Sequence, residues 1–416
     1  MREGEIVNHS EKRAALHTAL RDPSIMAPFH KEVHDVLEHM CTFANDVRTG
    51  SRRGCRGDKI TDIINVGIGG SEVGPKTVYH ALRKTHEQLR LHFLAAADGV
   101  AFDRIVGDLN PFKTLVIISS KSFKTRETAV NAEAINQWLL EAGISGKDRA
   151  SHLVVVSANS NAIHEMNLPE ENFFPIWEWV GGRFSVWSAI GLADVLALGA
   201  ETFLSLLAGA YAMDKHVAQS SAKENLALIL ALTAYHNSTH LGIEQHCFLP
   251  YDECLRTMVM WLQQLEMESL GKHLDAFGGH VKGTTGQAVW GGHGNESQHS
   301  FYQWLREGTS STSIDLLWSE TPNHCHAELH RVLIANAKAQ AEALITREDT
   351  DCFNAVSTIS IDQLNAIRLG SLMALYEHKT TMLGTLYGIN PFDQPGVEFG
   401  KRLSQQLENL NYTNNS

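Results

Sequence analysis

The sequence is poor in the features that mark several classes of protein. Its 416 residues include six cysteines, none in a Cys-x-x-Cys pair, which argues against a disulfide scaffold or a cysteine-rich zinc site. The longest apolar stretch, 226–234, is far too short to span a bilayer. The 35 Lys and Arg are outnumbered by 47 Asp and Glu, and a net charge of −12 does not favour nucleic-acid binding. We therefore expect a soluble protein that contacts neither nucleic acid nor membrane.

The N-terminus has no basic start followed by an apolar run, so we expect no signal peptide and a cytoplasmic protein. A composition of 43% hydrophobic and 20% charged residues is typical of globular chains, and the length allows two or three domains. The basic cluster Arg48, Arg52, Arg53 and Arg56 is interpreted as a solvated linker.

Short apolar runs alternate along the chain with segments of helical periodicity. Predicted strands cover 60–66, 91–97, 114–119, 152–158, 245–249, 287–290 and 313–318. Predicted helices cover 71–82, 125–142, 201–213, 222–237, 253–266, 298–307, 327–346 and 361–386. Such alternation predicts an α/β protein whose parallel sheets are covered by helices on both faces.

The pattern divides the chain into five parts. We predict an N-terminal helical segment (1–58), a first α/β domain (59–200), connecting helices (201–239), a second α/β domain (240–402) and a polar C-terminal tail (403–416).

The first candidate site follows the predicted strand 60–66. The run 65–74 reads Asn-Val-Gly-Ile-Gly-Gly-Ser-Glu-Val-Gly and should open a helix, where free backbone N–H groups favour an anion. Tight packing alone would also explain these glycines. Their spacing differs from the dinucleotide pattern G-x-G-x-x-G, so a nicotinamide dehydrogenase is the weakest interpretation.

The second candidate site follows the predicted strand 114–119. Hydroxyls at Ser120, Ser122 and Thr125, with Lys121 among them, suit the several oxygens of a phosphate monoester. The alternative is a helix N-cap flanked by exposed lysines. Because both candidate sites lie at the carboxyl ends of strands in one predicted sheet, phosphate recognition is favoured.

These two motifs resemble the sugar isomerase (SIS) domains that bind phosphosugars. Five further runs are similar, in the same chain order, to the glucose-6-phosphate isomerase family: 180–192, 249–252, 263–269, 298–303 and 392–401. The resemblance extends from about residue 60 to residue 401. It implies two SIS-like, flavodoxin-type units, a phosphosugar substrate, no metal or other cofactor, and a homodimer with a shared active site.

The activity implied is the interconversion of glucose 6-phosphate and fructose 6-phosphate through ring opening and a cis-enediol. Two alternatives stay open. One is an isomerase that also accepts mannose 6-phosphate, and the other is a SIS module that binds phosphosugars without catalysis.

The resemblance also implies roles for individual residues. Glu268 matches the base that carries the proton between C1 and C2, and Arg183 would stabilise the enediol oxygens. His299 matches the ring-opening histidine and Glu127 the carboxylate that orients it, while Lys401 matches the lysine that assists ring opening. The implied substrate-binding residues are Gly70, Ser71, Ser120, Lys121, Ser122, Phe123, Lys124, Thr125, Gln264 and Gln394.

A histidine-rich run offers a competing metal hypothesis. His324, Cys325, His326 and His330 can be drawn as a zinc cluster, but no carboxylate motif accompanies them, so histidines on a helix surface or at an interface are favoured. The sequence also departs from the family pattern at Lys124, where threonine is common, and at Gly292-His293, close to His299.

Overall fold

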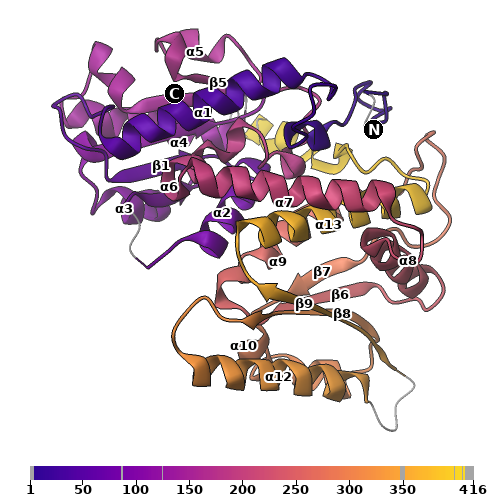
Figure 1. The fold of residues 1–416 in the computed structure, drawn as a ribbon. Coiled ribbons are helices and arrows are strands. Elements are labelled where there is room, and N and C mark those ends of the chain that lie inside the picture. Colours follow the sequence, from indigo (N-terminus) through magenta and orange to yellow (C-terminus); the bar gives the residue numbers. More distant parts are fainter. Residues whose placement is uncertain are drawn as a thin grey trace.

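The computed structural model describes residues 4–85, 88–123, 125–346, 352–397, 399–404 and 406–407. Two parallel sheets lie one above the other, with helices between them and on their outer faces (Figure 1). The prediction of an α/β protein with two helix-covered parallel sheets is confirmed. Within the described part of the chain, no helix has the length and apolarity needed to cross a bilayer.

The first sheet has the strand order β2-β1-β3-β4-β5, and every neighbouring pair is parallel. Its strands are β1 (Asp62–Val66), β2 (Arg90–Leu94), β3 (Thr114–Ser119), β4 (Leu153–Ser157) and β5 (Phe173–Pro175). All residues of β1, β3 and β4 are buried, as expected for strands covered on both faces. One face packs against α1 (His30–Thr49), α2 (Gly70–Leu82) and α6 (Leu192–Leu198). The other packs against α3 (Gly99–Val106), α4 (Arg126–Glu141) and α5 (Ala162–Glu165).

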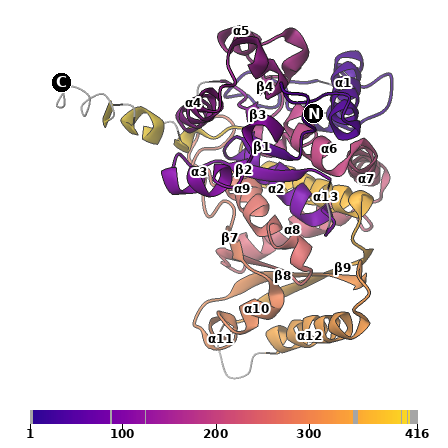
Figure 2. The same cartoon turned by 90° about the vertical axis from the view of Figure 1, so that its left-hand side faces the viewer.

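The second sheet has the order β7-β6-β8-β9 and is also parallel. Its strands are β6 (Gln245–Pro250), β7 (Ala288–Gly291), β8 (Thr312–Thr321) and β9 (Asn354–Gln363). Between the sheets lie α7 (Ala200–Gln219), α9 (Met258–Leu270) and α13 (Ala366–Leu386), with α8 (Leu226–Thr239) beside α13. The outer face carries α10 (Gly294–Gln298), α11 (Tyr302–Glu307) and α12 (Ala327–Ile345), which Figure 2 shows below the second sheet.

The structure differs from the predicted elements at several places, and helices α3 and α6 were also not predicted. Strand β9 was not predicted, and its last residues, 361–363, fall in the predicted helix 361–386. It is an edge strand whose side chains are mostly half-buried or exposed, so it lacks the apolar run that marks the central strands. The short β5 was also missed, and the predicted helix 298–307 is broken between α10 and α11. The domain limits remain predictions.

Two arginines of the basic cluster, which was predicted to be a solvated linker, form hydrogen bonds to other parts of the protein. Arg48 Nη1 donates to Leu196 O at 2.8 Å, and Arg52 Nη2 donates to Asn172 Oδ1 at 2.6 Å. These bonds tie the end of α1 to the first domain, so the interpretation was wrong for these two residues.

A buried ionic network joins the N-terminal segment to α7 and α13. The Arg21 guanidinium lies 2.8 Å from Asp214 Oδ1 and 2.6 Å from Glu377 Oε2, and Trp187 Nε1 donates to Glu377 Oε1 at 2.7 Å. His378 Nε2 lies 2.6 Å from Asp214 Oδ1. Burial raises the pKa of Glu377 to about 7, although the arginine opposes this rise. The N-terminal segment is therefore part of the folded core.

Candidate active site

The two predicted ligand-binding turns lie side by side at the carboxyl edge of the first sheet. β1 and β3 are neighbours, with Val66 in register with Ile118. Asn65 joins the two turns, because its Oδ1 accepts from Ser119 Oγ at 3.0 Å and its Nδ2 donates to Ser71 O at 2.9 Å. Strand order reverses direction between β1 and β3, and this is where open parallel sheets bind ligands.

Glycines at the start of α2 allow two other segments to approach. Gly69 has a φ of +60°, a left-handed conformation that glycine adopts without strain. A Cβ on Gly70 would lie 2.0 Å from Gly182 O, so only glycine allows the 3₁₀ turn Gly182–Phe184 to pack there. A Cβ on Gly69 would lie 3.2 Å from Gln264 Nε2. The glycine turn thus adjoins both the Arg183 turn and helix α9.

The Arg183 side chain is almost fully buried and bonds to each of the segments that surround it in the site. Nε donates to Ser269 Oγ at 2.7 Å, and Nη1 donates to Glu268 Oε2 at 3.2 Å and Gln394 Oε1 at 2.9 Å. Nη2 donates to Pro391 O at 2.5 Å and Asp393 O at 3.1 Å. Burial lowers the pKa of Arg183, and Glu268 opposes that shift, so the guanidinium stays charged.

Helix α9 presents Gln264 and Glu268 one turn apart on the same face, as their spacing predicts. Gln264 Nε2 donates to Glu268 Oε2 at 3.3 Å. The Glu268 side chain is 26% exposed, so solvent or a ligand reaches a carboxylate that two donors already orient. Gly70, Arg183, Gln264, Glu268 and Gln394 are therefore brought together by this chain alone.

Sequence reasoning missed Lys272, which follows the end of α9. Its buried ammonium donates to Glu268 O at 3.0 Å, Ser269 O at 3.0 Å and Asp393 O at 2.8 Å, and it lies 3.2 Å from Asp393 Oδ1. Burial and the charge of Arg183 lower its pKa. The predicted helix 253–266 ends six residues before Lys272, and α9 extends to Leu270, so the predicted helix end did not mark this lysine.

Hydrogen bonds from the N-terminal segment also hold the loop that carries Gln394. Asn390 Nδ2 donates to Asn8 Oδ1 at 2.9 Å, to Ser10 Oγ at 3.0 Å and to Asp393 Oδ2 at 3.0 Å. Ser10 Oγ also donates to the Asp393 carboxylate. These residues were not predicted to support the site, because their partners lie more than 380 positions away in the sequence.

The residues of the predicted phosphate turn lie in different surroundings. Lys121 Nζ donates to Glu178 O at 2.8 Å and Val180 O at 2.9 Å, so it holds the segment before the Arg183 turn. Ser120, Phe123 and Thr125 line a cavity on the α4 side, and Ser122 is exposed. Ser71 lies half-buried at the start of α2, and Lys124 lies outside the described residues.

Three predicted catalytic residues lie apart from this cluster. His299 is exposed at the end of α10, on the outer face of the second sheet, and Glu127 is exposed in the first turn of α4. Figures 1 and 2 show α4 and α10 at opposite ends of the molecule. Lys401 is exposed in the C-terminal segment, which in Figure 2 extends away from the body. One chain therefore does not bring these residues to Glu268, and their roles remain predictions.

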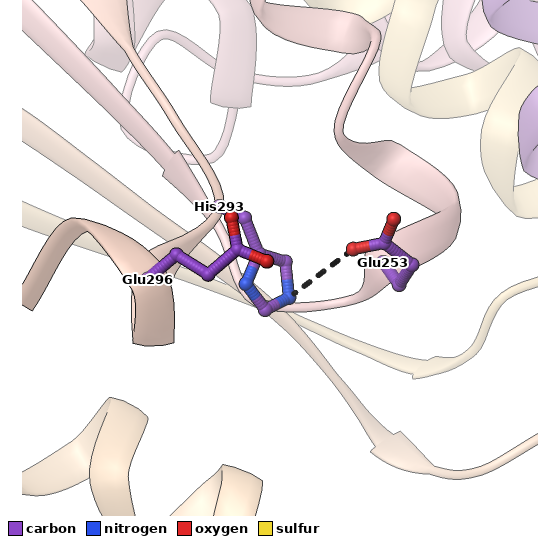
Figure 3. Close-up of side chains that lie close together, drawn as sticks. All are labelled: Glu253, His293 and Glu296. Atoms are coloured by element: carbon purple, nitrogen blue, oxygen red, sulfur yellow. Dashed lines mark ion pairs between the residues drawn. The ribbon is translucent and has the colours of Figure 1, made fainter.

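Among the residues that the structure describes, one group brings together side chains of metal-ligating types. Glu253, His293 and Glu296 place potential ligand atoms within 4.8 Å of one another (Figure 3). Arg256 Nη2 already lies 2.7 Å from Glu253 Oε2 and 2.6 Å from Glu296 Oε1. His293 Nε2 donates to Tyr251 O at 2.8 Å. A cation would have to displace Arg256, so we interpret the group as an ion-pair cluster.

Only part of the histidine-rich run lies at the surface. His324, Cys325 and His326 are exposed just before α12. His330 is buried in α12, and its Nε2 donates to Glu320 O at 3.1 Å.

Comparison with known proteins gives concordant matches. A family model described as phosphoglucose isomerase matches residues 1–416. Glucose-6-phosphate isomerase of Burkholderia lata is 40% identical over 97% of this chain and 79% of its own length. A crystal structure of a glucose-6-phosphate isomerase from Chlamydia trachomatis has a TM-score of 0.87 at 29% identity, covering 98% of this chain and 82% of that one. A hypothetical protein from Thermus thermophilus has a TM-score of 0.76 at 28% identity, covering 94% and 89% of the two chains.

Proposed function

This chain belongs to the phosphoglucose isomerase family, and we propose that Glu268, Arg183 and Gln264 form the proton-transfer half of its active site. The protein is an aldose–ketose isomerase that interconverts glucose 6-phosphate and fructose 6-phosphate. The observation that supports the proposal is the position of the Glu268 carboxylate, 3.2 Å from Arg183 Nη1 and one helical turn from Gln264, which adjoins the glycine turn of α2.

In this proposal Glu268 moves the proton between the two carbons. The C1 carbonyl of the open-chain aldose acidifies the hydrogen on C2, so a carboxylate can remove it and return it to C1. The hydroxyl proton moves from O2 to O1 in the same interconversion. Negative charge develops on these oxygens in the cis-enediol, and the fixed guanidinium of Arg183 stabilises it without moving. Gln264 and Arg183 hold the Glu268 carboxylate in one orientation.

Replacing the base tests this assignment directly. Glu268→Gln keeps the shape and the hydrogen-bonding capacity but cannot accept the proton, so turnover should fall by about 10²-fold or more. The KM for fructose 6-phosphate should change little, measured in a coupled glucose 6-phosphate assay. The matched control is Glu201→Gln, an exposed carboxylate on α7. Near-wild-type turnover in Glu268→Gln would remove this residue from the base role.

For ring opening we propose a homodimer in which His299 of one chain completes the site of the other. Glu127 of the chain that receives this histidine would orient it, and Lys401 would assist. The exposure of His299 and its position on the outer face support this arrangement. We also propose that the enzyme works in the cytoplasm.

A mixing experiment tests the shared site. Glu268→Gln and His299→Gln variants should each be inactive, but a dimer of one chain of each kind contains one intact site. Random pairing makes half of the dimers mixed, so about a quarter of the wild-type activity should return after denaturation and refolding together. Recovery that stays at the level of the separate variants would show that each chain builds its own site.

A further inference from the structure

The helix that carries the proposed base also carries a buried carboxylate on its other face. Glu266 is two positions from both Gln264 and Glu268, so its side chain leaves α9 about 200° around the helix axis from each of theirs. Its Oε1 accepts from Lys379 Nζ of α13 at 2.7 Å, and its Oε2 lies 3.3 Å from His246 Nδ1 of β6. Glu266 therefore connects α9 to two other elements at once.

The histidine extends this connection to β8. His246 Nε2 lies 3.0 Å from Asp315 Oδ2, which also accepts from Tyr376 Oη of α13 at 2.9 Å. Four buried acidic and basic residues meet here, and we call them the anchor cluster: His246, Glu266, Asp315 and Lys379. Buried charges are costly unless they are paired, and each acidic member of the cluster lies within 3.3 Å of a basic one.

The contacts indicate that His246 is an imidazolium. A neutral imidazole has one N–H and one bare nitrogen, whereas an imidazolium donates from both. Both ring nitrogens of His246 face a carboxylate oxygen, so a bare nitrogen would set two lone pairs against each other. Burial and the charge of Lys379 lower the pKa of His246, but Asp315 and Glu266 raise it by more. The protonated cluster then holds two positive and two negative charges.

We propose that Glu266 is a positioning residue for the isomerisation, which sets the rotation of α9 and so the direction in which Glu268 faces the substrate. This inference rests on the proposed role of Glu268 as the base. Lys379 ties α9 to α13, and α13 leads into the loop whose oxygens accept from Arg183. The anchor cluster therefore fixes the base relative to the positive charge that stabilises the enediol.

Replacing Glu266 tests this role. Glu266→Leu removes both contacts, so kcat in the coupled assay should fall about tenfold or more, with little change in the KM for fructose 6-phosphate. Glu266→Gln keeps an acceptor for Lys379, and its amide can donate to a neutral His246 ring, so it should recover most of the kcat. The matched control is Asp62→Leu, which removes a buried carboxylate paired with Arg90 at the start of β1 and should lower stability without lowering kcat.

The protonation of His246 gives a readout that a merely structural carboxylate would not change. The groups that face the ring are Glu266 on α9, Asp315 on β8, and Tyr376 and Lys379 on α13. The pKa of His246 is raised above its usual 6.5, so one bond of the cluster is lost as the pH rises through the folded-state pKa. The wild-type kcat should fall in that range. In Glu266→Gln the ring is already neutral, so this fall should be absent.

NMR of isotopically labelled histidine rings tests the charge of the cluster without an activity measurement. At about pH 7, where an unperturbed histidine is mostly neutral, both ring nitrogens of wild-type His246 should carry protons. The signal is identified by its loss in His246→Gln. A neutral wild-type ring at this pH would overturn the charge state that we assign to the cluster.

Circular dichroism identifies the variants that fold, and Glu266→Gln decides if Glu266→Leu does not. An unchanged kcat in folded Glu266→Leu would overturn the positioning role, and so would an alkaline fall of kcat in Glu266→Gln equal to that of the wild type. The base assignment is tested separately. If Glu268→Gln is inactive, these outcomes overturn the positioning role alone, whereas an active Glu268→Gln removes the base that Glu266 would position.

Discussion

Lys272 is the residue whose replacement most directly tests how the site is held. Its side chain is 9% exposed, and its ammonium joins the last turn of α9 to the loop that carries Gln394. Lys272→Met keeps most of the volume and removes all of these donors. The carbonyls of Glu268 and Asp393 and the carboxylate of Asp393 then lose a charged partner inside the protein.

The size of the effect follows from these contacts. Removing one partner of a buried ion pair costs about 3–5 kcal/mol, because it leaves the other charge uncompensated. Asp393 keeps Asn390 and Ser10 as hydrogen-bond partners, so we expect a loss near the lower limit, about 3 kcal/mol in the free energy of unfolding. A displacement of about 1 Å in the loop can also cost about 10²-fold in rate. We therefore expect a larger effect on kcat than on KM.

Urea unfolding gives the stability change, and the coupled isomerase assay separates kcat from KM. Lys282→Met, at an exposed position between α9 and β7, is the matched control. Lys272→Arg retains the charge and should recover part of the stability. If Lys272→Met unfolds at the wild-type urea concentration and keeps the wild-type kcat, Lys272 does not hold the loop.

Two further predictions concern other parts of the fold. Gly70→Ala places a methyl group 2.0 Å from Gly182 O, so the Arg183 turn must move; we expect at least about a tenfold loss of kcat/KM in the coupled assay, and wild-type activity would contradict the close packing. Glu377 has a pKa raised by burial to about 7 from its usual 4.5, so its contribution to stability is complete below pH 4.5 and is lost as the pH rises through about 7. Glu377→Gln should remove this part of the pH dependence, measured as urea midpoints at about pH 5 and about pH 8, and an unchanged dependence would assign it to other groups.

The parts of the fold that could be predicted are those in which local sequence decides the structure. The central strands β1, β3 and β4 are short apolar runs buried on both faces, and the sequence marks them clearly. The half-exposed edge strand β9 has no such run. It becomes a strand because β8 offers a long parallel partner, from Thr312 to Thr321, and this tertiary cause leaves little trace in periodicity.

The same distinction applies to the site. The i, i+4 spacing of Gln264 and Glu268 on one helix is local, and the glycine turn between strand and helix is local too. The contacts of Lys272, Asn390 and Ser10 join segments that are 118 and 380 positions apart, so only the folded chain reveals them. Lys121 shows a contact that the sequence did not indicate, because its ammonium donates to the backbone carbonyls of Glu178 and Val180, and its role in phosphate binding remains a prediction.

The geometry of Arg183 bears on how the proposed chemistry proceeds. A guanidinium has five N–H donors, and each nitrogen here is engaged: Nε with Ser269, Nη1 with Glu268 and Gln394, and Nη2 with two carbonyls of the 391–393 loop. Substrate oxygens can therefore bond to Arg183 only by displacing Glu268 or Gln394 from Nη1. Both bonds that hold the Glu268 carboxylate, from Arg183 Nη1 and Gln264 Nε2, go to its Oε2, so Oε1 can take the C2 proton while these bonds stay in place. Arg183 then serves first as a fixed anchor for the base and next as the positive charge that faces the enediol, and neither role requires the guanidinium to move.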